Sequence, residues 1–197
     1  MCGIAGIITN KLQPDESSAR VLRMMAAMEH RGPDSSDIIQ DKSCTFGHKR
    51  LAIIDTSEAG SQPMYRDGVY LVYDGELYNF RKERKLLEEK GVLFEGHSDT
   101  EVLLMSYLNY GESFLSRLRG IYSFALWDSK KQLLVCARDP LGVKPFLYSV
   151  TPKGFVFASE LKSMIASGAV SHEIDRNSLY TLLLRGSVPQ PSSMLKG

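Results

Sequence analysis

Cys2 is the first residue of this chain whose position suggests chemistry. Its small side chain favours removal of Met1, which would leave a thiol and a free α-amine on one residue. The pKa of an α-amine is about 7.7–8.0, so this amine can take the thiol proton at neutral pH. Cys2 is therefore a candidate nucleophile that carries its own base. The competing interpretation is a buried strand cysteine, because a free cysteine packs as a small hydrophobe.

A series of motifs in fixed order bears on this choice. They are MCGI at 1–4, RGPD at 31–34, HKRLAIID at 48–55, QP at 62–63, DGELYN at 74–79, SDTE at 98–101, RDPLGVKP at 138–145 and ASELK at 158–162. Together they resemble the class II glutamine amidotransferase domain, the N-terminal-nucleophile glutaminase. The series is most similar to the amino-terminal half of glutamine-hydrolysing asparagine synthetases. The resemblance covers about residues 1–170.

The resemblance implies a site for free glutamine, which is a zwitterion with a side-chain amide. It implies catalytic roles for Cys2, Asp74 and Gly75, and substrate binding by Arg50, Leu51, Ile53, Glu76 and Asp99. Arg50 would bind the substrate carboxylate, because a planar guanidinium fork suits that task better than a lysine. Asp99 would bind the substrate ammonium. Glu76 and backbone groups near Leu51 and Ile53 would orient the molecule.

Most of these residues also have an ordinary structural interpretation. Arg50 could be a solvated strand residue, Asp99 a helix cap, and Glu76 a turn carboxylate. The four histidines have no metal-ligand spacing, so no metal site is expected. Cys44 and Cys136 lie in apolar strands and are predicted to be core residues. Arg31 and Asp34 are interpreted as loop-shaping, because the Gly32-Pro33 backbone needs partners, and Lys144 lacks the full pattern of a phosphate loop.

Position 74 departs from the family pattern, which has Asn-Gly-Glu where this chain has Asp74-Gly75-Glu76. In the family, the asparagine amide and the glycine backbone N–H donate to the oxyanion of the tetrahedral intermediate. An ionised Asp74 cannot donate and would repel that charge; losing one donor costs about 10²–10³ in rate. Three explanations stay open: Asp74 is protonated and donates, Asp74 faces away and another donor serves, or the domain is weakened or inactive.

Hydrophobic patterning predicts an α+β fold. Strands are expected over 1–9, 45–55, 69–73, 121–127, 132–137, 145–150 and 155–158, and helices over 17–29, 80–90, 100–110, 160–167 and 175–185. Hairpins mixed with helices favour antiparallel sheets over a doubly wound parallel fold. The resemblance adds the arrangement, an αββα sandwich of two mainly antiparallel sheets between helical layers.

Composition limits the partners and the compartment. Lys and Arg number 24 and Asp and Glu 23, with a net charge of +1 and no block of like charge, so neither nucleic acid nor a membrane is an expected partner. No apolar run approaches the roughly 18 residues of a membrane span, and no signal peptide is recognisable. Three cysteines form no disulfide framework, which indicates a reducing, cytoplasmic location.

Residues 1–170 are expected to form the glutaminase domain, and residues 171–197 a linker or the start of a missing synthetase domain. No segment resembles the Ser-Gly-Gly-x-Asp-Ser loop that holds pyrophosphate in the synthetase half. We therefore expect no cofactor in this chain, with ATP and Mg only in the missing domain. The expected partners are glutamine and a synthetase domain, and the resemblance leaves a homodimer open.

The leading hypothesis is glutamine hydrolysis to glutamate and ammonia through a Cys2 thioester, supplying ammonia for amide synthesis, with asparagine as the favoured product. The alternative is a weakened or inactive glutamine-binding scaffold, because Asp74 replaces the asparagine. A third hypothesis is a hydrolase of other amides, such as acylated amines. Arg50 and Asp99 argue against it, because an acylated substrate has no free zwitterion to bind.

Overall fold

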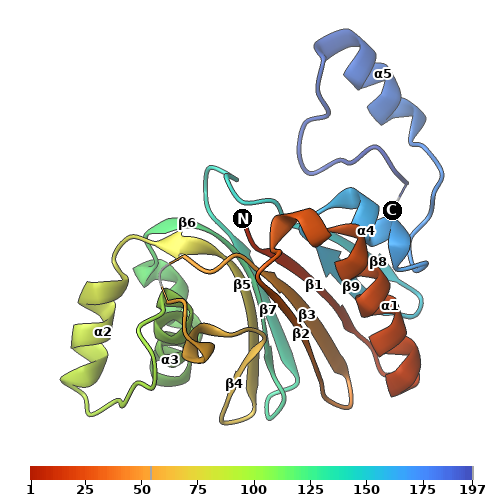
Figure 1. The fold of residues 1–197 in the computed structure, drawn as a ribbon. Coiled ribbons are helices and arrows are strands. Elements are labelled where there is room, and N and C mark those ends of the chain that lie inside the picture. The colour runs from red at the N-terminus through yellow and green to blue at the C-terminus, as the bar shows by residue number, and fades with distance from the viewer. Residues whose placement is uncertain (54, 197) are drawn as a thin grey trace.

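Two antiparallel β-sheets lie face to face between two helical layers in the computed structural model, which describes residues 1–53 and 55–196 (Figure 1). The first sheet has the strand order β2-β3-β1-β9-β8 and the second the order β4-β5-β6-β7. Helices α1 and α4 pack on the first sheet, and α3, backed by α2, packs on the second. The predicted αββα sandwich is confirmed.

The elements follow one another as expected for hairpin-rich sheets. The strands are β1 (Gly3–Ile8), β2 (Ser35–Gln40), β3 (Cys44–Arg50), β4 (Met64–Arg66), β5 (Val69–Leu77), β6 (Gly120–Asp128), β7 (Leu133–Arg138), β8 (Leu147–Thr151) and β9 (Gly154–Ala158). The α-helices are α1 (Pro14–Ala27), α2 (Phe80–Glu88), α3 (Asp99–Tyr110), α4 (Leu161–Ala166) and α5 (Arg176–Arg185).

Side-chain alternation along each strand decides which residues enter the space between the sheets. On β1, Ile4 and Ile8 belong to the core between the sheets, whereas Ala5 and Ile7 pack under the helices. On β5, Tyr70 and Val72 face the first sheet, whereas Leu71 and Tyr73 face α3. Because the strand period is two, even-numbered residues of both strands continue toward the same gap. Cys2 from one sheet and Asp74 from the other therefore meet there.

Two boundaries differ from the expectation in ways that matter for the site. The strand predicted over 45–55 ends at Arg50, and a loop follows; Ile54 lies outside the described residues. Asp55 explains the loop, because its carboxylate accepts the backbone N–H groups of Ser57 and His97, both at 2.9 Å, which a continuing strand would not allow. The strand predicted over 69–73 instead continues to Leu77 and carries Asp74, Gly75 and Glu76.

Strands β2 and β4 were not expected. β2 is an edge strand whose first three residues, Ser35, Ser36 and Asp37, are exposed and polar, so it has no apolar alternation to reveal it. β4 has only three residues and pairs with β5. Both strands gain their regular structure from a neighbour and not from their own sequence.

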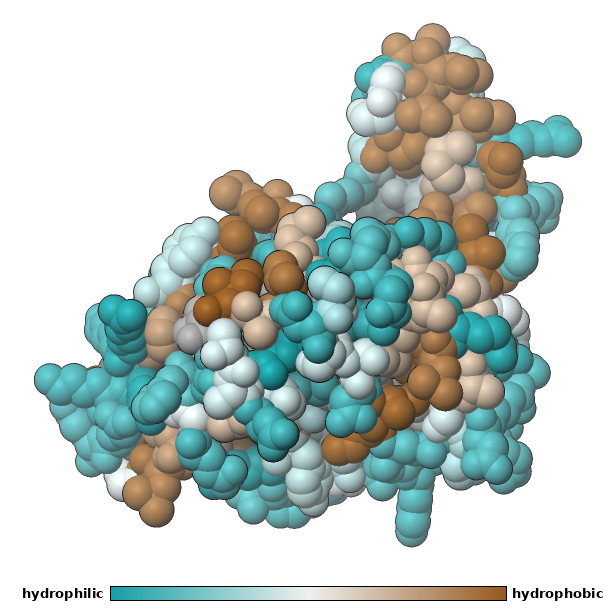
Figure 2. All heavy atoms as spheres, in the orientation of Figure 1, coloured by the Kyte–Doolittle hydropathy of each residue, from teal (hydrophilic) through white to brown (hydrophobic). Residues whose placement is uncertain are grey.

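Helix α5 stands apart from the sandwich (Figure 1), and Leu183 and Leu184 on it are 77% and 66% exposed. Figure 2 shows hydrophobic side chains gathered at this corner of the molecule. Asp175 caps the helix, as expected, by accepting the Ser178 N–H at 2.7 Å. The boundary predicted near residue 170 stays a prediction. In the described part of the chain, none of the helices has the length and apolar character needed to span a membrane.

Candidate active site

A cleft of about 90 Å³ opens at the end of the gap between the two sheets, and all eight predicted site residues line it. They arrive from four places: the start of β1, the end of β3 with the loop after it, the end of β5, and the N-terminus of α3. Residues that lie up to 97 positions apart in the sequence, from Cys2 to Asp99, thus share one small cavity.

The Cys2 thiol is held by the backbone of Leu51. Leu51 N–H points to Cys2 Sγ at 3.4 Å, and Sγ lies 3.6 Å from the Leu51 carbonyl oxygen. Burial raises the pKa of the thiol above its ordinary value, whereas the Leu51 contact and the positive charge of Lys144 lower it and the Asp74 carboxylate raises it. The buried thiol therefore needs a nearby base to become a nucleophile, and this is the part that the α-amine of a processed Cys2 would play.

The Asp74 carboxylate is buried and paired with two cations. Arg31 Nη2 donates to Asp74 Oδ2 at 2.9 Å, and Lys144 Nζ donates to Asp74 Oδ1 at 3.1 Å. Both oxygens thus accept hydrogen bonds from positive groups, which is the arrangement of a carboxylate and not of a donor. This geometry argues against the first of the three explanations, in which Asp74 itself donates. Asp74 lines the cleft and does not face away, so of the second explanation only the need for another donor is left. A role for Asp74 in catalysis stays a prediction.

Arg31 joins this pair to the nucleophile. Its Nε donates to the Cys2 carbonyl oxygen at 2.7 Å and its Nη1 to Glu160 at 3.3 Å. The interpretation of Arg31 as loop-shaping missed this contact, because Glu160 and Asp74 are distant in sequence. The same interpretation suits Asp34, whose carboxylate accepts the Ala52 N–H at 2.9 Å beside the cleft.

The loop after β7 is built to present Lys144. The Asp139 carboxylate accepts the backbone N–H groups of Val143 and Lys144, both at 3.0 Å, which fixes the turn. Gly142 has φ +64°, and a Cβ there would lie 2.9 Å from the guanidinium carbon of Arg138, so only glycine fits both constraints. This network holds the Lys144 side chain in a buried position in the cleft.

Arg50 is fixed by the loop that follows β3. Its Nη2 donates to the carbonyl oxygens of Asp55 and Ser57, the latter at 3.0 Å, and its Nη1 donates to Ser61 Oγ at 3.3 Å. These bonds leave N–H groups on Nη1 and Nε that can receive a carboxylate. Leu51 and Ile53 follow Arg50 directly in the chain and line the same cleft, so two of the three groups predicted to orient the substrate lie next to Arg50.

Asp99 is not the cap of α3. The cap is Ser98, whose hydroxyl accepts the Glu101 N–H at 3.2 Å, so the capping role considered for Asp99 belongs to its neighbour. Asp99 Oδ2 instead accepts the Tyr73 hydroxyl at 2.7 Å and the Leu77 N–H at 2.9 Å. Burial raises the pKa of Asp99, and these two hydrogen bonds lower it. They orient a carboxylate toward the cleft, as an ammonium site requires.

Glu76 and Gly75 complete the wall formed by β5. The pKa of Glu76 is raised by burial and then by the charge of Asp99, with Lys144 acting in the opposite direction. Gly75 pairs with Tyr122 of β6, and a Cβ on it would lie 2.5 Å from the Ile121 carbonyl oxygen. The close approach of β6 explains why position 75 has no side chain.

The residues set aside as structural are placed as follows. Cys44 is buried and Cys136 half-buried in the core between the sheets, as expected. His48 is fully buried with Nε2 3.3 Å from the Tyr73 carbonyl oxygen, and burial lowers its pKa to about 3. Among the described residues, no three His, Cys, Asp or Glu side chains are grouped as metal ligands. The expectation of no metal stays a prediction.

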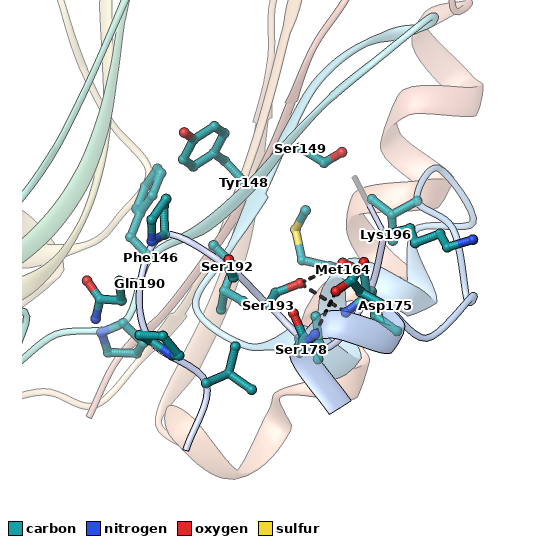
Figure 3. Close-up of a pocket in the computed structure, with 18 of the residues that line it drawn as sticks. Phe146, Tyr148, Ser149, Met164, Asp175, Ser178, Gln190, Ser192, Ser193 and Lys196 are labelled. Carbon is teal, nitrogen blue, oxygen red and sulfur yellow. Dashed lines mark hydrogen bonds between the residues drawn. The ribbon is translucent and has the colours of Figure 1, made fainter. Parts of the chain in front are cut away.

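A larger cavity of about 970 Å³ lies between β8, α4, α5 and the C-terminal segment (Figure 3). Its walls contain neither a cysteine nor any of the predicted site residues. Its carboxylate, Asp175, is occupied as the cap of α5 (Figure 3). The larger cavity is therefore not the candidate active site, because the predicted nucleophile and charged side chains lie together in the smaller cleft.

Comparisons relate the whole chain to known proteins. The family model of the glutamine amidotransferase domain matches residues 1–197. An asparagine synthetase (glutamine-hydrolysing) of Bacillus subtilis is 42% identical over 98% of this chain and 32% of its own length. A putative asparagine synthetase of Methanocaldococcus jannaschii is 35% identical over 100% of this chain and 41% of its own length. The chain thus spans about a third of the length of these relatives.

Among solved structures, the glutamine phosphoribosylpyrophosphate amidotransferase of B. subtilis superposes with a TM-score of 0.70. The match covers 85% of this chain and 44% of that one, at 23% sequence identity. At this identity the likeness establishes the fold alone. It agrees with the sandwich described above.

Proposed function

The chain belongs to the glutamine amidotransferase domain family, and on that basis we propose that it hydrolyses free glutamine to glutamate and ammonia through a thioester on Cys2. The observation that carries the proposal is the convergence of a thiol, a fixed guanidinium and a fixed carboxylate in one cleft of about 90 Å³. Arg50 and Asp99 are the charge pair that a free amino acid needs at its carboxylate and its ammonium. With both ends of the amino acid bound in this way, the Cys2 thiol is the group available to attack the side-chain amide of the substrate.

The steps follow from these positions. Once Met1 is removed, the Cys2 α-amine takes the thiol proton, and the thiolate attacks the carboxamide carbon. The intermediate collapses, and its nitrogen leaves as ammonia with the proton that the amine held. Water then attacks the thioester and releases glutamate. The family resemblance assigns the backbone N–H of Gly75 as a hydrogen-bond donor to the oxyanion.

The proposal extends to the destination of the ammonia. Relatives three times as long are named asparagine synthetases, so we assign the ammonia to a synthetase domain that forms the amide of asparagine. The exposed leucines of α5 offer a surface to such a domain. ATP and Mg belong to that domain in this proposal, and the location is cytoplasmic. The alternative of an inactive scaffold receives no separate support from the comparisons.

Glutamate release by the purified chain tests the proposal. Cys2→Ala should abolish release, and so should retention of Met1, which intact mass spectrometry detects, because either change removes half of the nucleophile–base pair. Cys136→Ala is the matched control, since this cysteine lies outside the cleft. Release that survives in Cys2→Ala would contradict the proposal.

A further inference from the structure

Lys144 is a buried cation in the cleft, and the proposed steps of glutamine hydrolysis assign it no role. Its side chain is 9% exposed, and Nζ donates to Asp74 Oδ1 at 3.1 Å. Within the described ranges 1–53 and 55–196, this is the one polar partner of the ammonium. An ammonium carries three N–H groups, so two remain for another acceptor. A loop fixed by Asp139 and by a glycine with positive φ maintains this position.

The other cations near Cys2 are committed elsewhere. Arg31 uses Nε, Nη1 and Nη2 on the Cys2 carbonyl oxygen, Glu160 and Asp74. Arg50 is held by carbonyl oxygens of its own loop and is assigned to the substrate carboxylate. Among the described residues that line the cleft, Lys144 is therefore the cation whose remaining N–H groups are not already assigned to the substrate carboxylate.

We propose that the Lys144 ammonium donates a hydrogen bond to the oxyanion that forms when Cys2 attacks the substrate amide. This inference rests on the proposed function. Asp74 occupies the position from which an amide would donate, and Nζ lies 3.1 Å from its Oδ1, so the ammonium reaches the same region. Lys144 thus replaces the donor that a carboxylate at position 74 cannot supply.

Atoms and charges balance without a further reactant. As the bond from Cys2 Sγ to the carbon forms, the π electrons of the carbonyl move to oxygen, which accepts N–H groups from Lys144 and Gly75. Lys144 keeps its proton throughout. When an electron pair on the oxyanion reforms the carbonyl bond, the carbon–nitrogen bond breaks. The proton held by the Cys2 α-amine then goes to the leaving nitrogen.

Asp74 does not cancel this effect, because it is already shared. The Asp74 carboxylate is shared between Arg31 and Lys144, and Arg31 also pairs with Glu160. In a buried site with a low dielectric constant, a fixed ammonium beside a developing oxyanion is worth more than in water.

The test compares kcat and KM for glutamate release in Asp74→Ala and in Asp74→Ala/Lys144→Met. The Asp74→Ala background removes the partner of Lys144, so the second substitution reports on the donor and not on a broken ion pair. We expect the double variant to lose about 10²-fold in kcat relative to Asp74→Ala, with little change in KM, since the contact forms only in the transition state. Lys82→Met, at an exposed position on α2, is the control.

Each outcome decides the question. Equal kcat in Asp74→Ala and the double variant would overturn the role of Lys144 while leaving the proposed function intact. Loss of release in Asp74→Ala with an active parent would also overturn it, because Asp74 would then be the required group. A parent chain without Cys2-dependent release overturns the proposed function itself. If the methionine variant does not fold, Asp74→Ala/Lys144→Gln, which keeps a polar head group in the cleft, replaces it. If Asp74→Ala itself does not fold, Lys144→Gln is compared with the parent instead, because Asp74 then still pairs with Arg31, and equal kcat would again overturn the role of Lys144.

Discussion

Asp74→Asn should destabilise this protein even though it restores the residue of the family pattern. Asp74 is 1% exposed, and each of its oxygens accepts from a different cation, Arg31 at 2.9 Å and Lys144 at 3.1 Å. Asparagine keeps one acceptor oxygen and places an NH₂ group where the other oxygen was. One of the two buried cations then faces a donor and loses its counter-charge.

The magnitude follows from the contacts that remain. Breaking a buried ion pair by removing one partner costs about 3–5 kcal/mol. Arg31 retains Glu160 and the Cys2 carbonyl oxygen, which favours the lower end of the range, about 3 kcal/mol. For a chain of about 200 residues, 1 kcal/mol shifts Tm by about 2–4 °C, so Tm should fall by about 6–12 °C.

Thermal and denaturant unfolding of the parent and Asp74→Asn measure this difference. Asp37→Asn, an exposed position on the edge strand β2, is the matched control and should change stability by about 0.5 kcal/mol or less. Glutamate release should stay within about 10-fold of the parent, because Lys144 already donates and the new amide adds a donor. An Asp74→Asn variant as stable as the parent would refute the ion-pair reasoning. A silent parent beside an active variant would show that Asp74 switches the site off.

Two further predictions concern the substrate clamp and acid stability. Arg50→Ala should raise KM for glutamine by about 10–100-fold with a smaller effect on kcat, because a charge-assisted hydrogen bond contributes about 1.5–3 kcal/mol to substrate binding. Steady-state kinetics measures both constants. An unchanged KM would contradict the role of Arg50 and would favour the hypothesis of a hydrolase that acts on acylated amines. Burial lowers the pKa of His48 to about 3, below the unfolded value of about 6.5, so the unfolded chain binds a proton that the folded chain refuses between these values. The contribution of His48 to stability is full above pH 6.5 and is lost as the pH falls toward 3. The free energy of unfolding, measured with denaturant, should be about 2–3 kcal/mol lower at pH 4.5 than at pH 7. In His48→Phe the free energy of unfolding should fall less over the same pH range.

The sequence predicted the layers of the fold because its apolar strands and amphipathic helices signal themselves locally. It missed β2, because Ser35, Ser36 and Asp37 show no alternation, and it extended β3 past Arg50 because residues 51–54 are apolar. The bend there depends on hydrogen bonds from Ser57 and His97 to the Asp55 carboxylate. His97 is 42 residues away from Asp55, and no local pattern carries such information.

For the site, the sequence predicted which residues take part but not which partners they contact. Residue types and order sufficed to name the thiol, the guanidinium and the carboxylates, and period-two alternation carries Cys2 and Asp74 into one gap. What Asp74 does there depends on Arg31 and Lys144, which lie 43 and 70 residues away in sequence. Taken alone, a carboxylate beside a forming oxyanion argues for a damaged site. Taken with two buried cations, of which one keeps free N–H groups, the same carboxylate is neutralised, and the task of donating passes from position 74 to Lys144.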